Sequence, residues 1–145
     1  MAEKLNVKIE AAEIEKMVSE YARSAGFVKE GVRETKERFK SSLEFELAGN
    51  GRKYLFKKNL DWVDVGPETE CTDRVKIASD GKEVFSHYFK DWCYEYSGGG
   101  IPYAGSEGEI LFELDDPLSK WLYDHLKHTA EKLKEGEENG NKLFK

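Results

Sequence analysis

Apolar side chains near the N-terminus recur with the spacing of an amphipathic helix. From Ile14 to Ala25 they fall three or four residues apart, with charged side chains between them. Gly26 follows, and glycine readily takes the left-handed conformation that ends a helix. Residues 5–9 alternate between apolar and polar, so a short strand is expected before the helix.

The period changes to two from Phe39, which predicts a strand as far as Leu47. Asn50 and Gly51 then give a strong signal for a two-residue hairpin, because both positions of a type I′ turn need positive φ. A hairpin centred there pairs Leu47 with Tyr54. The same register pairs residues further along both strands: Phe45 with Phe56, and Glu44 with Lys57.

Three more stretches show strand periodicity after this turn. The outgoing strand continues through residue 62, a further strand covers residues 71–77, and a last one covers residues 110–114. Between them, Asp80-Gly81 gives a second hairpin signal. Residues 98–105, with four glycines and one proline, lack the spacing of a phosphate-binding loop and are interpreted as either a connector or a lid.

Residues 82–97 are rich in aromatic side chains and fit either a helix or a strand. As a helix they form one apolar stripe, with Asp80 as the N-cap. As a strand they complete a hairpin with residues 71–77, and aromatic side chains favour a pleated surface. We favour the strand, in which a two-residue hairpin places His87 opposite Arg74.

A C-terminal helix is predicted to begin at Asp116. Asp116 suits the N-cap, and Pro117 suits the first helical position, where no N–H is needed. An apolar stripe with helical spacing follows, and Gly136 ends it. Residues 1–136 are therefore predicted to form a single domain, followed by a flexible polar tail over residues 137–145.

The predicted fold class is α+β, because a strand and a helix precede a run of strands and a final helix. We expect a mostly antiparallel curved sheet of about 5–6 strands, with the N-terminal and the long C-terminal helix packed on one face. This element order resembles the helix-grip architecture of START-type and Bet v 1-type ligand-binding proteins over most of the chain. It departs from their pattern after the first strand, where a pair of short helices is usual.

Composition then limits the class of protein. The chain has 145 residues and 18 aromatic side chains (8 Phe, 7 Tyr and 3 Trp), which suits one domain with a core and excludes a disordered acidic chain. No apolar run approaches the roughly 18 residues of a membrane span, and the first residues do not resemble a secretion signal. We expect a cytoplasmic protein with no membrane partner, in which Cys71 and Cys93 are free thiols.

The charge balance argues against one class of partner. The formal net charge is −6, and the basic clusters Arg52-Lys53 and Lys57-Lys58 are too short to drive nucleic-acid binding by counterion release. We therefore expect no nucleic-acid partner. The chain also has 21 Glu and 18 Lys but no Gln, which fits either a thermophilic source or a mesophilic protein rich in exposed helix.

Catalytic and metal-binding patterns are weak. The cysteines lack CxxC spacing and the three histidines are too few to form a metal centre, so neither a metal nor another cofactor is predicted. An enzyme ranks third among the hypotheses, and we lean against it. It would have to use His87 together with acidic side chains: Asp61, Asp64 and Asp91.

Aromatic side chains between Phe85 and Tyr103 form the candidate site. On a strand, the tyrosines and tryptophan of this stretch share one face, and the phenylalanines share the other. The predicted ligand-binding residues are Trp62, His87, Tyr88, Trp92, Tyr94, Tyr96, Tyr103 and Trp121, with His125 as an alternative to His87 for the polar contact.

The favoured hypothesis is a non-catalytic binding module. A small apolar or aromatic ligand would be held between the sheet and the C-terminal helix. The alternative is an acidic protein–protein interaction or inhibitor protein. Such a protein would act through an exposed aromatic and acidic surface. A homodimer is one form of this alternative.

Overall fold

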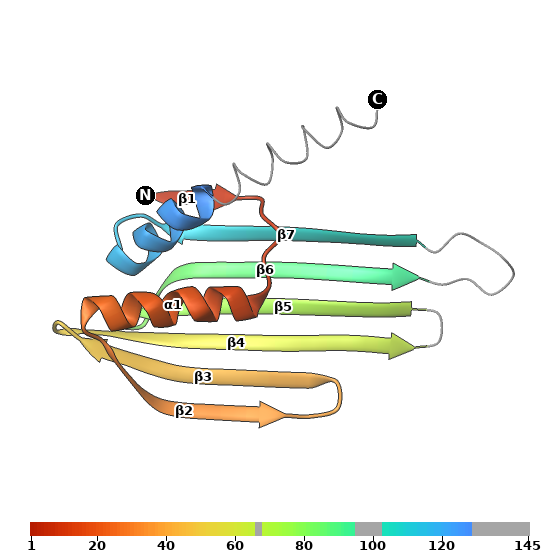
Figure 1. The fold of residues 1–145 in the computed structure, drawn as a ribbon, viewed down its shortest axis with the longest axis horizontal. Helices are drawn as coiled ribbons and strands as arrows, with labels where there is room; N and C mark the ends of the chain where they lie inside the picture. The colour runs from red at the N-terminus through yellow and green to blue at the C-terminus, as the bar shows by residue number, and fades with distance from the viewer. Residues whose placement is uncertain (66–67, 95–102, 129–145) are drawn as a thin grey trace, which may run out of the picture.

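The computed structural model describes residues 1–65, 68–94 and 103–128. Their main element is one antiparallel sheet of seven strands in the order β1-β7-β6-β5-β4-β3-β2 (Figure 1). The elements in chain order are β1 (Ala2–Leu5), α1 (Ala11–Ala25), β2 (Val28–Lys36), β3 (Lys40–Gly49), β4 (Arg52–Val65), β5 (Glu68–Ser79), β6 (Lys82–Tyr94) and β7 (Tyr103–Glu113). A helix over residues 117–128 follows them.

The sheet is therefore larger than the predicted five or six strands, although the mostly antiparallel α+β class is confirmed. The additional strand is β2, which pairs with β3 along one edge of the sheet. Every residue of β2 is exposed. An edge strand with no buried side shows no alternation of apolar and polar residues, so its sequence carries no strand period.

The first hairpin has the predicted turn and register. Asn50 and Gly51 have φ of 52° and 71°, as a type I′ turn requires. The expected pairs are all present: Leu47 with Tyr54, Phe45 with Phe56, and Glu44 with Lys57. Phe45 and Phe56 stack with ring centroids 4.5 Å apart and are almost fully buried, so the hairpin contributes directly to the core.

The second hairpin confirms the strand interpretation of the aromatic segment, because β6 spans Lys82–Tyr94. Its register differs from the prediction beyond a bulge between Ile77 and Ala78. Val84 is the additional residue on β6, and both Val84 and Phe85 are buried. His87 consequently lies opposite Val75, and the prediction that it lies opposite Arg74 is wrong. Because side chains alternate between the two faces of a sheet, one inserted residue moves every later side chain of the strand to the opposite face.

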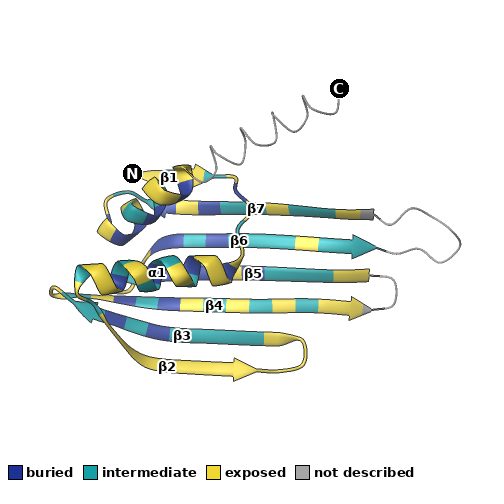
Figure 2. Ribbon diagram, in the orientation of Figure 1, coloured by how far each residue is buried: buried dark blue, intermediate teal, exposed yellow. Residues whose placement is uncertain are grey.

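Both described helices contact the same face of the sheet, which we call the inner face. Ile14 and Val18 of α1 are fully buried in one core cluster with the sheet residues Phe56 and Ile77. Helix 117–128 reaches the same face through Tyr123, whose ring lies 5.2 Å from that of Phe112. Figure 2 shows the buried positions gathered at the end of the sheet that these helices cover. We call the opposite face the outer face.

Asp116 joins the C-terminal helix to the first hairpin. One carboxylate oxygen accepts a hydrogen bond from the N–H of Ser119 at 3.0 Å, so the predicted N-cap is present. The other accepts from Tyr54 at 2.9 Å and from Arg52 at 3.0 Å. The remainder of the predicted helix and residues 137–145 lie outside the described part of the chain.

Candidate functional site

A segment of extended chain crosses the inner face between β1 and α1. We call residues 6–10 the crossing segment. The sequence predicted a strand over residues 5–9, but pairing with β7 stops at Leu5, and the chain then passes over Gly108. A Cβ on Gly108 would lie 2.2 Å from the carbonyl oxygen of Val7. Glycine is thus the residue that lets the two backbones approach.

Two buried side chains hold the crossing segment. Asp73 of β5 accepts a hydrogen bond from the N–H of Ala11 at 3.0 Å. It therefore caps α1 from another strand, because the N-cap residue Glu10 makes no side-chain cap of its own. His87 of β6 donates from Nε2 to the carbonyl of Ile9 at 2.5 Å.

The side chain of His87 therefore has a structural role, which is to hold the crossing segment. It is 2% exposed, and its Nδ1 has no hydrogen-bond partner among the described atoms. Burial lowers the pKa of His87, and this outweighs the opposite effects of the Ile9 carbonyl and of Asp73. The imidazole is thus held neutral, with its proton on Nε2 directed at the crossing segment.

Beyond the crossing segment the inner face continues without cover from the described residues. Figure 1 shows α1 and helix 117–128 over one end of the sheet, while β4 to β7 extend well past them. We call this uncovered end the distal floor. The alternation along β4 to β7 places these inner-face residues on it: Leu60, Trp62, Asp64, Thr69, Cys71, Phe89, Asp91, Cys93, Ala104 and Ser106.

The distal floor combines half-buried apolar groups with a few polar ones. Cys71 lies opposite Trp62 on one side and opposite Asp91 on the other. Neighbouring strands are about 5 Å apart, so a short side chain separates two larger ones. Next to it, a hollow of about 590 Å³ is lined by Thr69, Phe89, Asp91, Trp92, Cys93, Ala104, Gly105 and Ser106.

The thiol of Cys71 on the distal floor is not set up as a nucleophile. Burial, aided by the charges of Asp73 and Asp91, raises the pKa of Cys71 to about 11, so the thiolate is scarce at neutral pH. Both Cys71 and Cys93 are free. Within the described ranges, no group of three or more His, Cys, Asp or Glu side chains is placed to hold a metal ion.

The acidic residues considered for an enzyme do not converge on His87. Asp91 lies on the distal floor, whereas His87 lies under the crossing segment. Asp61 belongs to the outer face, because it alternates with the inner-face residues Leu60 and Trp62 along β4. Asp64 is exposed near the far end of β4, opposite Thr69.

The predicted aromatic site is divided between the two faces. Trp62 lies on the distal floor, but Tyr88, Trp92 and Tyr94 point away from the helices on the outer face. Trp121 packs against Tyr21 of α1 at the covered end of the inner face, with ring centroids 5.4 Å apart. The bulge at Val84 causes this division, because it turns the tyrosine and tryptophan face outward.

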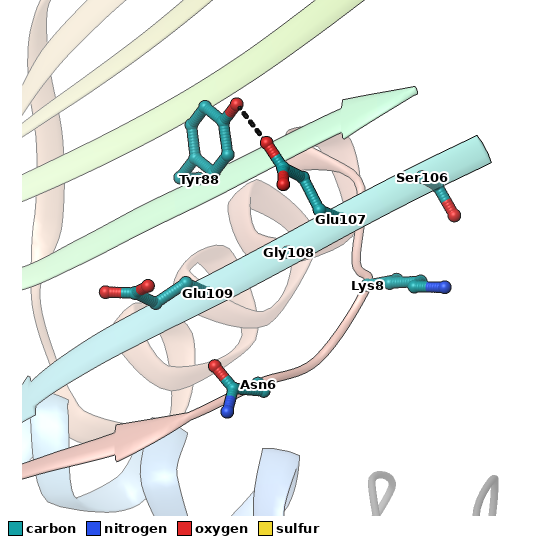
Figure 3. Close-up of a pocket in the computed structure, with 7 residues that line it drawn as sticks. All are labelled: Asn6, Lys8, Tyr88, Ser106, Glu107, Gly108 and Glu109. Carbon is teal, nitrogen blue, oxygen red and sulfur yellow. Dashed lines mark hydrogen bonds between the residues drawn. The ribbon is translucent and has the colours of Figure 1, made fainter. Parts of the chain in front are cut away.

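On the outer face, the tyrosines of β6 are tied to neighbouring strands. Tyr88 donates to Glu107 at 2.9 Å (Figure 3), and Tyr94 donates to Glu70 at 2.6 Å. Trp92 covers Gly105, where an added Cβ would lie 2.5 Å from the indole ring. A further hollow of about 460 Å³ is lined by residues of the crossing segment, β6 and β7: Asn6, Lys8, Tyr88, Ser106, Glu107, Gly108 and Glu109 (Figure 3).

Some predicted positions are described only in part. Tyr96 lies outside the described residues. Tyr103 is the first residue of β7, where its backbone pairs with Tyr94. Of the glycine-rich stretch over residues 98–105, the last three residues belong to β7, and the others lie outside the described chain. His125 donates from Nδ1 to the carbonyl of Trp121 at 2.9 Å within its own helix.

Sequence reasoning did not identify Asp73 or Gly108 as site residues, and it considered Asp91 only as a catalytic acid. An isolated glycine inside a strand pattern, as at Gly108, is a signal of close backbone approach that could have found the crossing. Models of known protein families do not match this chain, nor do the curated proteins. No helix in the described residues is long and apolar enough to cross a membrane.

Proposed function

We propose that this chain is a non-catalytic binding module that holds a small apolar or aromatic ligand on the distal floor. The observation that carries the proposal is the extent of the inner face. It continues past the described helices with Trp62 and Phe89 only half-buried. The strand order and the shared face of the two helices support the helix-grip outline that the element order resembles.

The chemistry of the distal floor favours an aromatic ligand of limited polarity. Trp62 and Phe89 offer flat apolar surfaces, and Asp91 and Ser106 supply a small number of polar contacts, as is usual in ligand sites. Burying about 150 Å² of apolar ligand surface contributes about 4 kcal/mol. That corresponds to a Kd of about 1 mM before any polar contact is added.

Binding of the neutral fluorescent probe N-phenyl-1-naphthylamine to the full chain tests this proposal. Trp62→Ala is expected to weaken probe binding about tenfold, because one large aromatic contact is worth about 1.4 kcal/mol or more. Tyr88→Ala is the control, since it removes an aromatic side chain from the outer face at a position that does not line the hollow on the distal floor. Equal losses in the two variants, or no binding to the wild-type chain, would refute a site on the distal floor.

The outer-face position of Tyr88, Trp92 and Tyr94 favours the alternative, a protein-interaction surface. Tyrosine and tryptophan are enriched at interfaces, where an apolar body and a polar edge are both used. If the chain self-associates through this face, Tyr88→Ala lowers the dimer fraction in analytical ultracentrifugation and Trp62→Ala leaves it unchanged. The same two variants therefore separate the two functions.

A further inference from the structure

Three cations cluster on the outer face, at the centre of the sheet. Lys57 on β4 lies directly opposite Lys76 on β5, and Arg74 is on the same face two residues before Lys76. All three are exposed. None of them forms a salt bridge within the described part of the chain. We call these three residues the basic patch.

The pairing of Lys57 with Lys76 works against the stability of the sheet. Like charges directly opposite each other across a ladder repel, whereas opposite charges there attract. Lys57 already has the opposite arrangement on its other side, where it lies across from Glu44. In a chain with 29 acidic residues, a second lysine opposite Lys57 leaves positive charge unneutralised at the sheet centre.

The positions paired with Arg74, and the position on β6 paired with Lys76, are neutral and polar. Ser86 lies opposite Lys76, and Asn59 and Tyr88 lie on either side of Arg74. The Arg74 guanidinium also lies 5.3 Å from the centre of the Tyr88 ring. Two adjacent rows across β4, β5 and β6 therefore present cations and hydrogen-bonding groups with no carboxylate among them.

We propose that the basic patch docks an acidic segment of a partner protein. Arg74 and Lys76 are two residues apart on one strand, so their side chains leave the sheet about 7 Å apart. Carboxylates at alternate positions of an extended segment have the same spacing. Such a segment would neutralise the basic patch and relieve the repulsion between Lys57 and Lys76.

The surroundings favour a protein segment over a nucleic acid. Carboxylates border the basic patch on three sides: Glu44 opposite Lys57, Asp61 further along β4, and Glu109 opposite Tyr88. A nucleic-acid backbone carries charge at every nucleotide and would meet these carboxylates on leaving the basic patch. A short acidic segment can place its charges over the three cations alone.

Fluorescence polarisation with a labelled oligoglutamate peptide and the full chain tests this inference, at about 20 mM and about 500 mM salt. We expect binding at low salt that weakens at high salt, and a loss of about tenfold in affinity on Lys76→Glu. This variant replaces a repulsive pair by an attractive one, so it is expected to fold at least as well as the wild type. Lys16→Glu on α1 makes the same charge change on an exposed residue of the helix and is expected to stay within about twofold of wild type.

Three results would overturn the inference. In the first, oligoglutamate does not bind at low salt. In the second, Lys16→Glu weakens binding as much as Lys76→Glu, which would show a net-charge effect only. In the third, oligothymidylate binds more tightly than oligoglutamate and is lost on Lys76→Glu, which would assign the basic patch to nucleic acid. Because the outer face is separate from the distal floor, these results do not depend on the binding proposed there.

Discussion

Replacing Gly108 with alanine tests how the crossing segment is held on the inner face. The added Cβ would lie 2.2 Å from the carbonyl oxygen of Val7 and 2.9 Å from its carbonyl carbon. Close carbon–oxygen contacts in proteins are about 3.3 Å, so the crossing segment would have to move by about 1 Å. The contacted atoms are backbone, and no side-chain rotation relieves the clash.

The expected cost follows from what that movement breaks. Overpacking in a core costs about 1–3 kcal/mol. Moving the crossing segment also disturbs the hydrogen bonds to Asp73 and His87, and a buried polar group that loses its partner costs about 1–3 kcal/mol. We expect Gly108→Ala to lower the free energy of unfolding by about 3 kcal/mol, which is about 10 °C in Tm for a chain of this size.

Urea unfolding followed by circular dichroism measures this loss. Gly105→Ala is the control on the same strand, because the Cβ there meets the ring of Trp92, a half-buried side chain that can turn aside. We expect it to cost about 1 kcal/mol. A Gly108→Ala variant within about 1 kcal/mol of wild type, or a more costly Gly105→Ala, would contradict the role given to Gly108.

Two further predictions concern buried polar groups. Burial lowers the pKa of His87 in the folded protein, so the unfolded chain binds a proton more readily and stability falls as the pH drops below about 6.5. His87→Gln should flatten that fall in urea titrations between about pH 7 and pH 5, and an unchanged slope would contradict the assignment. Asp116→Ala removes a helix cap and the acceptor of two more hydrogen bonds, so it should cost about 2–4 kcal/mol by the same assay. The exposed Asp124→Ala serves as its control and should cost under about 1 kcal/mol; equal costs would refute the argument.

Local signals account for what could be predicted from the sequence. The turn at Asn50 and Gly51 requires positive φ, and that requirement alone determines the pairs along β3 and β4. The helix ending at Gly26 and the cap at Asp116 also depend on residues within one turn. Each of these features is decided by neighbours along the chain.

What could not be predicted depends on contacts between distant residues. The bulge at Val84 arises because both Val84 and Phe85 are buried in the core, and periodicity along β6 does not show this. The predicted site placed Tyr88 and Trp92 under the helix, and a single residue of register moved them to the outer face. The exposed strand β2 was missed because its charged side chains have no buried partner.

The crossing segment has a consequence for how this protein can change over time. It separates a well-packed end of the inner face, where most side chains are fully buried, from the distal floor, where they are half-buried or exposed. Substitutions at Trp62 or Asp91 therefore remove few core contacts, whereas those at Phe56 or Ile77 remove many. One end of the sheet can diverge to suit a new ligand while the other keeps the chain folded, so binding and stability can evolve almost independently within a single sheet.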